Sequence, residues 1–253
     1  MASQSLLHFL SVGLPAIPAQ GVARSGNTTN SQYSSDDVSH IVAWPEFNYA
    51  TILQRFGPIL NEIQVQPAPF GTPPGPIRSE GAFQSYFYEL VRPRIRRALR
   101  AGFEHLAPLS ERRLVSVTLD YGSQGMVIDH FRPDTAFLST SPDHPSSVNR
   151  APGDLKVSWK WKSSDRTSSN GLIEREYLKV MAQVNFYMKQ HGARHGFVLT
   201  NTEFVAIKRL DTNGLLAVAD PIPWTSGGIG QPSVLLGLWY LGMLAAEEDT
   251  WSM

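Results

Sequence analysis

The chain has 253 residues, of which 42% are hydrophobic and 17% charged, a length that suits one sizeable core and is short for two independent domains. Its 22 basic residues balance its 22 acidic residues, which excludes a uniformly basic coat for non-specific nucleic-acid binding but leaves a local basic surface open. The lack of cysteine excludes disulfides, Cys-ligated zinc, iron–sulfur clusters and a thiol nucleophile.

The first part of the chain has the composition of a poorly packed arm. Residues 21–40 consist mainly of Ser, Asn, Thr, Asp and Gly, which offer little to bury. We therefore expect a disordered or loosely packed N-terminal arm over residues 1–43, followed by a single domain over residues 44–253. Asn48 is a good N-cap for a helix that runs to about Ile63.

A second helical region follows a linker. Residues 66–76 are rich in proline and glycine and predict a linker over the surface. Ser79 can cap the next helix, Pro93 is expected to kink or divide it, and Gly102 is expected to end it.

The pattern then changes from helical to strand-like. Residues 114–120 predict a first strand, residues 126–138 a long and bulged second strand, and residues 155–161 a third. Residues 141–153, rich in Pro, Ser and Asn, predict a loop between the second and third strands.

The remaining elements complete an α/β pattern. Residues 174–191 have the clearest helical periodicity, and Gly192 supplies a stop. Two short strands, 197–200 and 204–210, precede an apolar stretch, 234–246, that predicts a buried C-terminal helix. The order of elements predicts an α/β fold, with a mixed sheet of the α+β kind flanked by helices. Because the apolar stretch is shorter than the ~20 residues that span a bilayer, we expect an intracellular protein, in the nucleus or cytoplasm, without a membrane partner.

Three charged residues stand in or beside strands that should pack into the core. Asp134 lies inside the second strand, and Asp154 opens the third strand two positions before Lys156. Residues i and i+2 of a strand point to the same face, so Asp154 and Lys156 should project side by side. If the second and third strands pair, Asp134 joins them, and two carboxylates share one small site with an ammonium.

The chemistry of such a site favours a metal ion. Two neighbouring carboxylates repel each other, and a divalent cation commonly relieves that repulsion. The oxygens of Asp134 and Asp154, with waters and the carbonyl of Leu155, suit Mg²⁺ or Mn²⁺. Lys156 can then hold or deprotonate a water aimed at a phosphate, which predicts hydrolysis of a phosphodiester.

These motifs resemble those of the PD-(D/E)XK nuclease superfamily. Pro133-Asp134 and Asp154-Leu155-Lys156 are similar to its signature, and the segment from Gln183 to Tyr187 matches the Q-x-x-x-Y pattern of its RecB-like members. The element order over residues 79–210 resembles the superfamily's restriction-endonuclease-like αβββαβ core. The flanks, with extra N- and C-terminal helices, resemble those of fungal proteins that carry this domain.

The resemblance implies a Mg²⁺-dependent nuclease whose expected substrate is DNA, with RNA as the less favoured alternative. It makes Asp134 and Asp154 the metal ligands and Lys156 the water-positioning residue. Members of the superfamily often add a glutamate from the helix before the sheet, and the candidates are Glu80 and Glu89. At ~100° per residue, Glu80 falls about 60° from Phe83 on the buried stripe, whereas Glu89 falls about 120° away, so helical geometry favours Glu80 as the further catalytic and metal-binding acid.

The later helix offers two more candidates for the site. Gln183 lies at the edge of the apolar stripe, about 100° from Val184, where its amide can reach a metal-bound water or a phosphate. Tyr187 lies nearer the apolar centre, with its hydroxyl directed toward the site. Each can equally be an ordinary residue of this helix, Gln183 at the surface and Tyr187 in the core.

A basic region supplies candidate nucleic-acid contacts. Residues 89–113 hold seven arginines and three glutamates, and Lys160 follows the acidic site. We expect Arg96, Arg97, Arg100, Lys160 and Tyr187 to contact nucleic acid, through phosphate binding and base stacking. A solvated helix face is the alternative for the arginines, and the core is the alternative for Trp159 and Trp161.

Three functions remain open on these grounds; the third, a pocket for a small phosphorylated or carboxylated ligand, has no positive sign in the sequence. The first is a nuclease that uses Asp134, Asp154, Lys156, Gln183 and Glu80, with nucleic acid as partner and a homodimer as a possible assembly. The second is a catalytically inactive nuclease-fold protein that binds nucleic acid or protein, because fold alone does not dictate activity.

Overall fold

The computed structural model describes residues 3–27, 29–109, 114–140 and 148–253. The helices are α1 (Leu6–Leu10), α2 (Tyr49–Glu62), α3 (Glu80–Tyr86), α4 (Arg92–Leu106), α5 (Gly171–Gln190) and α6 (Val234–Ala246). The strands are β1 (Gln4–Ser5), β2 (His40–Ala43), β3 (Gln64–Val65), β4 (Val117–Tyr121), β5 (Thr135–Ser139), β6 (Asn149–Lys156), β7 (His195–Thr200), β8 (Glu203–Arg209), β9 (Leu215–Val218) and β10 (Ile222–Pro223). The chain is a mixed α/β protein, as the sequence predicts.

One large mixed sheet organises the described part of the chain. Its strands follow the order β2-β9-β8-β7-β6-β5-β4, and β10 pairs with β8 beside this path. β2 runs parallel to β9, and β6 runs parallel to β7, whereas the other neighbours are antiparallel. Two parallel neighbours need a long crossover connection, and α5 supplies it between β6 and β7.

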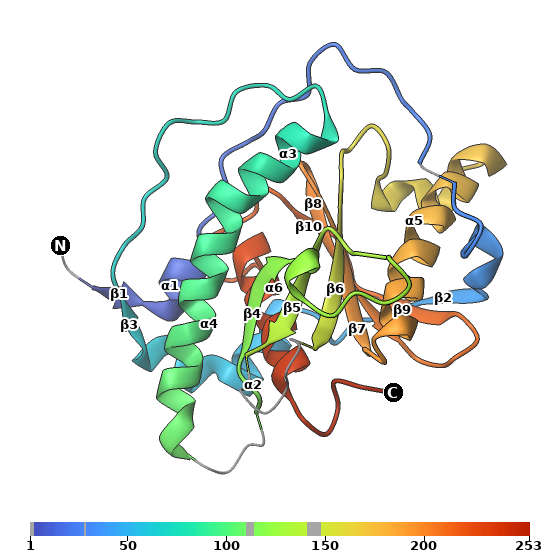
Figure 1. Ribbon diagram of the computed structural model, residues 1–253. Coiled ribbons are helices and arrows are strands. Elements are labelled where there is room, and N and C mark those ends of the chain that lie inside the picture. Colours follow the sequence, from blue (N-terminus) through green and yellow to red (C-terminus); the bar gives the residue numbers. More distant parts are fainter. Residues whose placement is uncertain (1–2, 28, 110–113, 141–147) are drawn as a thin grey trace.

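Helices cover both faces of the sheet, with α4 and α5 on opposite sides of β5 and β6 in Figure 1. Side chains alternate between the faces along β7. Phe197 and Leu199 join the core that α6 and α4 share, whereas Val198 joins the smaller core under α5. This alternation determines which polar side chains of β6 face α5.

The helix boundaries largely follow their sequence signals. Asn48 caps α2 by accepting a hydrogen bond from the Thr51 N–H at 2.9 Å, and Ser79 caps α3 by accepting from the Ala82 N–H at 3.2 Å. Ahead of Pro93, the predicted point of division, a π-helical turn, η2 (Phe87–Val91), separates α3 from α4. α4 continues past Gly102, the expected end, because that residue packs in the helix interior against Trp239.

The C-terminal apolar stretch forms α6, which is buried along its whole length. It packs against α4 and against β4, β6 and β8. The predicted buried C-terminal helix is thus confirmed. Within the described ranges, no helix is both long enough and apolar enough to cross a membrane.

The second and third strands differ from their predicted bounds. The long second strand is reduced to β5, because Asp129 and His130 adopt positive φ angles of 50° and 65° and form an irregular turn before it. The third strand begins at Asn149 rather than residue 155, and Lys156 is its last residue. Beyond it the chain turns at once, since the Lys160 N–H donates to the Val157 carbonyl at 2.8 Å. The end of the predicted loop is therefore strand; residues 141–147 lie outside the described part.

The segment 1–43, expected to be a disordered or loosely packed arm, contributes to the core. Leu6 and Leu10 of α1 are fully buried, and Phe9 is 3% exposed. α1 packs against α2 and α6, which explains this burial. The polar composition of residues 21–40 carries no information about the apolar residues that precede them.

Candidate functional site

The register of β5 and β6 brings the predicted acids together. Thr135, the first residue of β5, pairs with Gly153. Asp134 therefore directly precedes β5, rather than lying inside a strand as predicted, and sits beside Asp154 and Leu155 of β6. Asp154 in turn pairs with Val198 of β7, whose side chain packs under α5. Asp154 and Lys156 therefore face α5, since residues two apart on a strand share a face.

Asp134, Asp154 and Lys156 form one compact charged cluster. The Lys156 Nζ donates a hydrogen bond to Asp154 Oδ1 at 2.8 Å and lies 2.7 Å from Oδ2. Asp134 Oδ2 accepts a hydrogen bond from the Leu155 N–H at 2.9 Å. Asp154 has no exposed surface and Lys156 is 7% exposed, so the ion pair is shielded from water.

The electrostatics of the cluster follow from burial and from two adjacent acids. The pKa of Asp134 is raised to about 7, chiefly by burial and then by the charge of Asp154, with Lys156 and the Leu155 N–H opposing both effects. Burial also acts to lower the pKa of Lys156, but Asp154, Asp134 and Glu80 outweigh it and raise that pKa above its usual value. Lys156 is therefore a permanent cation beside a carboxyl group that holds its proton to unusually high pH.

The two candidates on α5 lie beside this cluster. Gln183 Nε2 donates to the Tyr187 hydroxyl at 3.4 Å, and the Tyr187 side chain is buried. The pKa of Tyr187 is raised to about 12, chiefly by burial; the Gln183 hydrogen bond opposes the rise, and the charges of Asp154 and Asp134 contribute to it. The structure thus puts the Tyr187 hydroxyl within electrostatic reach of both acids.

Glu80 is the first residue of α3, and its carboxylate borders the cluster from outside the sheet. Its carboxylate pairs with Lys160 Nζ at 3.2 Å, and its charge contributes to the raised pKa values of Asp134 and Lys156. Both partners are about one-quarter exposed, so the ion pair borders solvent. Glu80 and Lys160 thus lie at the edge of the cluster rather than within its shielded part.

The predicted basic contacts on α4 lie farther away. Arg96 pairs with Asp120 at 3.1 Å, and Arg97 lies over the Phe9 ring at 5.7 Å. Arg96 and Arg100 line a groove of about 470 Å³ that also includes Val117, at the end of β4 remote from the acids. Arg112 and Arg113, which contribute to the basic excess, lie outside the described residues.

Two tyrosines that the sequence did not indicate belong to the site. The Tyr88 hydroxyl, from η2, donates to the Asp134 carbonyl at 2.6 Å, and its ring stacks on Tyr121 with 3.8 Å between ring centroids. Tyr33 comes from the N-terminal arm and packs against Phe186 at 5.3 Å. Burial raises the pKa of Tyr33, and the charge of Asp154 adds to this effect while Lys156 opposes it.

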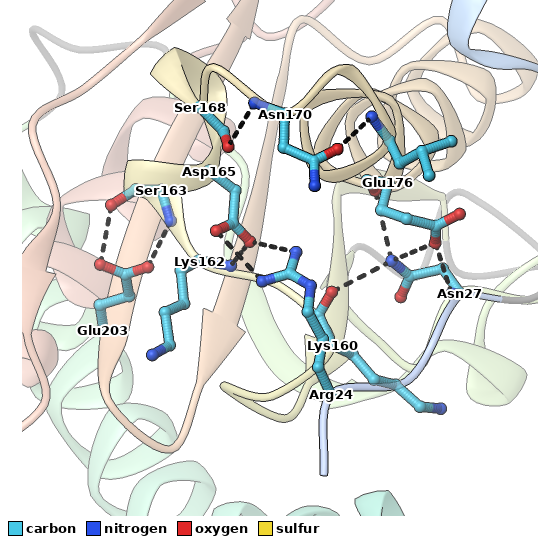
Figure 2. A network of polar contacts seen from close by, with 11 residues as sticks. Arg24, Asn27, Lys160, Lys162, Ser163, Asp165, Ser168, Asn170, Glu176 and Glu203 are labelled. Atoms are coloured by element: carbon cyan, nitrogen blue, oxygen red, sulfur yellow. Dashed lines mark hydrogen bonds and ion pairs between the residues drawn. The ribbon is translucent and has the colours of Figure 1, made fainter.

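Polar contacts hold the arm beside the site (Figure 2). Arg24 pairs with Asp165 at 2.9 Å. The Asn27 N–H donates to Glu176 of α5 at 2.6 Å, and the Asn27 side chain donates to the Lys160 carbonyl at 3.3 Å. The arm is thus anchored on both α5 and the turn after β6. No local pattern predicts Tyr33 or Tyr88, because each reaches the site through contacts distant in sequence.

The donor set is suited to a hard divalent cation. Asp134 and Asp154 offer only oxygen ligands, and Mg²⁺ is commonly held by one or two carboxylates and several waters. Asp134 Oδ2 is its only oxygen engaged in a hydrogen bond within the described chain, which leaves Oδ1 for a ligand. Among the described residues, no group of three or more His, Cys, Asp or Glu side chains is arranged to hold a metal.

Comparison with known proteins gives no relative: no family model, curated protein or solved structure matches the chain.

Proposed function

We propose that the protein is a metal-dependent nuclease with a restriction-endonuclease-like core, which hydrolyses phosphodiester bonds of DNA or, as the second choice, RNA. The observation that carries the proposal is the convergence of Asp134, Asp154 and Lys156 beside Gln183 and Tyr187. Burying two acids and a cation together costs desolvation free energy, and ionisable groups with such strongly perturbed pKa values cluster at functional sites.

The residues divide into distinct roles. Asp134 and Asp154 would hold Mg²⁺ or Mn²⁺, which supplies charge stabilisation at a phosphate and an activated water. Lys156, whose Nζ contacts both oxygens of Asp154, would hold a water or a phosphate oxygen by hydrogen bonds or deprotonate that water. Gln183 and Glu80 border the site and would orient the substrate or its water.

A nucleic-acid strand would leave the acids along the basic side of the molecule. Lys160 and Tyr187 lie at the site itself, and the α4 groove with Arg96 and Arg100 lies at the far end of β4. The groove reaches Thr118, three residues from Tyr121 at the acid end of β4, so at ~3.3 Å per residue it begins roughly 10 Å from that end.

A second candidate function is a binding protein without turnover. The observation that favours it is the enclosed ion pair, because Lys156 already contacts both oxygens of Asp154, which has no exposed surface. Such a pair is stable by itself and leaves little room for a cation unless Lys156 moves. Metal binding without cleavage would be the corresponding experimental result.

The deciding experiment combines metal titration with a cleavage assay. Single-stranded DNA, duplex DNA and RNA are incubated with Mg²⁺ or Mn²⁺ and with wild type, Asp134→Asn or Lys156→Met. We expect both variants to lose about 100-fold or more of the cleavage rate. Asp249→Asn and Lys162→Met change exposed residues of the same types and serve as matched controls. Cleavage that survives both site substitutions would refute the assigned residues, and metal binding with no cleavage of any substrate would favour the binding protein.

A further inference from the structure

A second polar cavity lies on the opposite face of the sheet from the acids. It has a volume of about 510 Å³, and its walls include Trp44, Arg55, Arg194, His195, Lys208 and Tyr240. His195 is three positions before Val198 on β7, and an odd offset along a strand turns the side chain to the other face. The cavity is therefore separate from the proposed nuclease site, and its volume is in the range of small-molecule pockets.

The cations of this cavity are incompletely neutralised. Arg55 pairs with Glu247 and donates to the Tyr240 hydroxyl at 3.2 Å. Arg194 instead donates to a neutral acceptor, the Ser252 carbonyl, at 3.0 and 3.2 Å. The Lys208 ammonium lies 5.7 Å from the centre of the Trp44 ring, and among the described residues it has no carboxylate partner. Two of the three cations thus have no carboxylate partner among the described residues, and with Glu46 as the second acid beside Glu247 the lining has one positive charge in excess (three cations against two acids).

His195 supplies an independent sign of a ligand. Its side chain is 97% buried, and its Nδ1 has no hydrogen-bond partner within the described chain. A buried polar atom without a partner costs about 1–3 kcal/mol, and such atoms need an explanation. Burial, with a smaller contribution from the charges of Lys208, Arg194 and Arg55, lowers the pKa of His195 to about 3. The ring is therefore neutral and offers both a donor and an acceptor.

The aromatic walls define the shape of the occupant. The His195 ring stacks on Trp44 with 5.8 Å between centroids and 16° between planes, and Tyr240 forms another wall. Flat apolar surfaces next to a cationic end suit a ligand with a flat body and one charged group.

We propose that this cavity binds a small molecule that carries an oxyanion, a carboxylate or a phosphate ester, on a flat apolar body. Arg194 and Lys208 bind the oxyanion, His195 adds a hydrogen bond, and Trp44 packs against the body. The site is independent of the proposed nuclease activity.

Isothermal titration calorimetry on the full chain at constant ionic strength tests this proposal. The probes are sodium benzoate, inorganic phosphate and benzamide, which has the flat ring of benzoate without its charge. We expect saturable binding of benzoate or phosphate with a Kd below ~10 mM, and binding of benzamide at least ~tenfold weaker than that of the oxyanion. Tighter binding of benzoate would identify a carboxylate ligand, and tighter binding of phosphate a phosphate ester.

Variants assign the binding to this cavity. Arg194→Gln combined with Lys208→Gln should weaken oxyanion binding ~tenfold or more, whereas Lys189→Gln, at an exposed position on α5, should leave it unchanged. If the double variant does not fold, the single Lys208→Gln variant replaces it. Lys208 is only half-buried, so this substitution should leave the fold intact and still weaken oxyanion binding. The proposal is overturned if neither oxyanion binds saturably, if benzamide binds as tightly as benzoate, or if the cavity variants bind like wild type.

Discussion

The buried ion pair between Lys156 and Asp154 allows a stability test that needs no activity. Lys156→Met would leave the fully buried Asp154 carboxylate without a cation, next to the second acid, Asp134. Asp154→Asn would leave the Lys156 ammonium buried, but Asp134 would remain to balance it. Removing one partner of a buried pair costs about 3–5 kcal/mol, so we expect Lys156→Met at the upper end of this range and Asp154→Asn below it.

The structure also sets the size of the coupling between the two residues. The Nζ–O contacts of 2.7 and 2.8 Å mean that the charge centres lie within roughly 4 Å, where the attraction is about 4 kcal/mol at an effective dielectric constant of 20. The double variant Asp154→Asn/Lys156→Met removes both charges together. We therefore expect it to be less destabilised than the sum of the two single variants by ~2 kcal/mol or more.

Urea unfolding of the four proteins, in EDTA at pH 7 and followed by circular dichroism, measures these differences. Lys162→Met is the control, since Lys162 is exposed and its removal should change the free energy of unfolding by no more than ~0.5 kcal/mol. If the effects of the two single substitutions add within ~0.5 kcal/mol in the double variant, Lys156 and Asp154 are not coupled in solution, and the ion pair at this site is refuted.

Three further predictions concern packing, pH and the arm. Gly153→Ala should destabilise the protein by about 1–3 kcal/mol, because a Cβ at this position would lie 2.1 Å from the Phe197 ring. Gly171→Ala is the control and should not destabilise the protein, since a Cβ at the start of α5 would meet open space. Equal denaturation midpoints for the two variants would contradict this prediction. His195 has a folded-state pKa of about 3, below its unfolded value near 6.5, so its contribution to stability is complete above pH 6.5 and is lost as the pH falls toward 3. Between those values the free energy of unfolding of His195→Gln should fall less steeply with decreasing pH than that of wild type, by up to about 1.4 kcal/mol per pH unit, and parallel curves would exclude a neutral buried imidazole. Arg24→Ala combined with Asn27→Ala should speed proteolytic cleavage of residues 21–40 while lowering the melting temperature little, because these contacts border solvent; unchanged cleavage would show that they do not hold the arm.

The elements that the sequence predicts well have strong local signals. The cap residue Asn48 and the uninterrupted apolar run of α6 each determine their own element. The strand errors arise where local signals mislead. Asp129 and His130 turn the chain with positive φ angles and no glycine, so the sequence before β5 still has the pattern of a strand.

The first half of β6 is missed for the opposite reason: its residues form a strand but have the composition of a loop. Arg150 and Pro152 lie in a strand that is buried throughout. Arg150 is accommodated because Glu248 pairs with it at 2.8 Å, the Ala245 carbonyl accepts a hydrogen bond from it, and its guanidinium carbon lies 4.4 Å from the centre of the Trp251 ring. These partners come from the other end of the chain, and no property of residues 149–153 indicates them.

The same reasoning explains which part of the site is visible in the sequence. Asp154 and Lys156 can be found because charged residues are rare in a buried strand, and their spacing places them on one face. Tyr33 cannot be found this way, since the contacts that anchor its segment join residues 133 to 149 positions apart. A single exposed polar contact of this kind contributes at most about 1 kcal/mol, so the arm is held by several such contacts acting together. Moving Tyr33 away from the site would therefore break only weak contacts. Asp134, Asp154 and Lys156 are instead held in or directly beside the strands β5 and β6. Only residues positioned by such regular elements follow a spacing that can be recognised in the sequence.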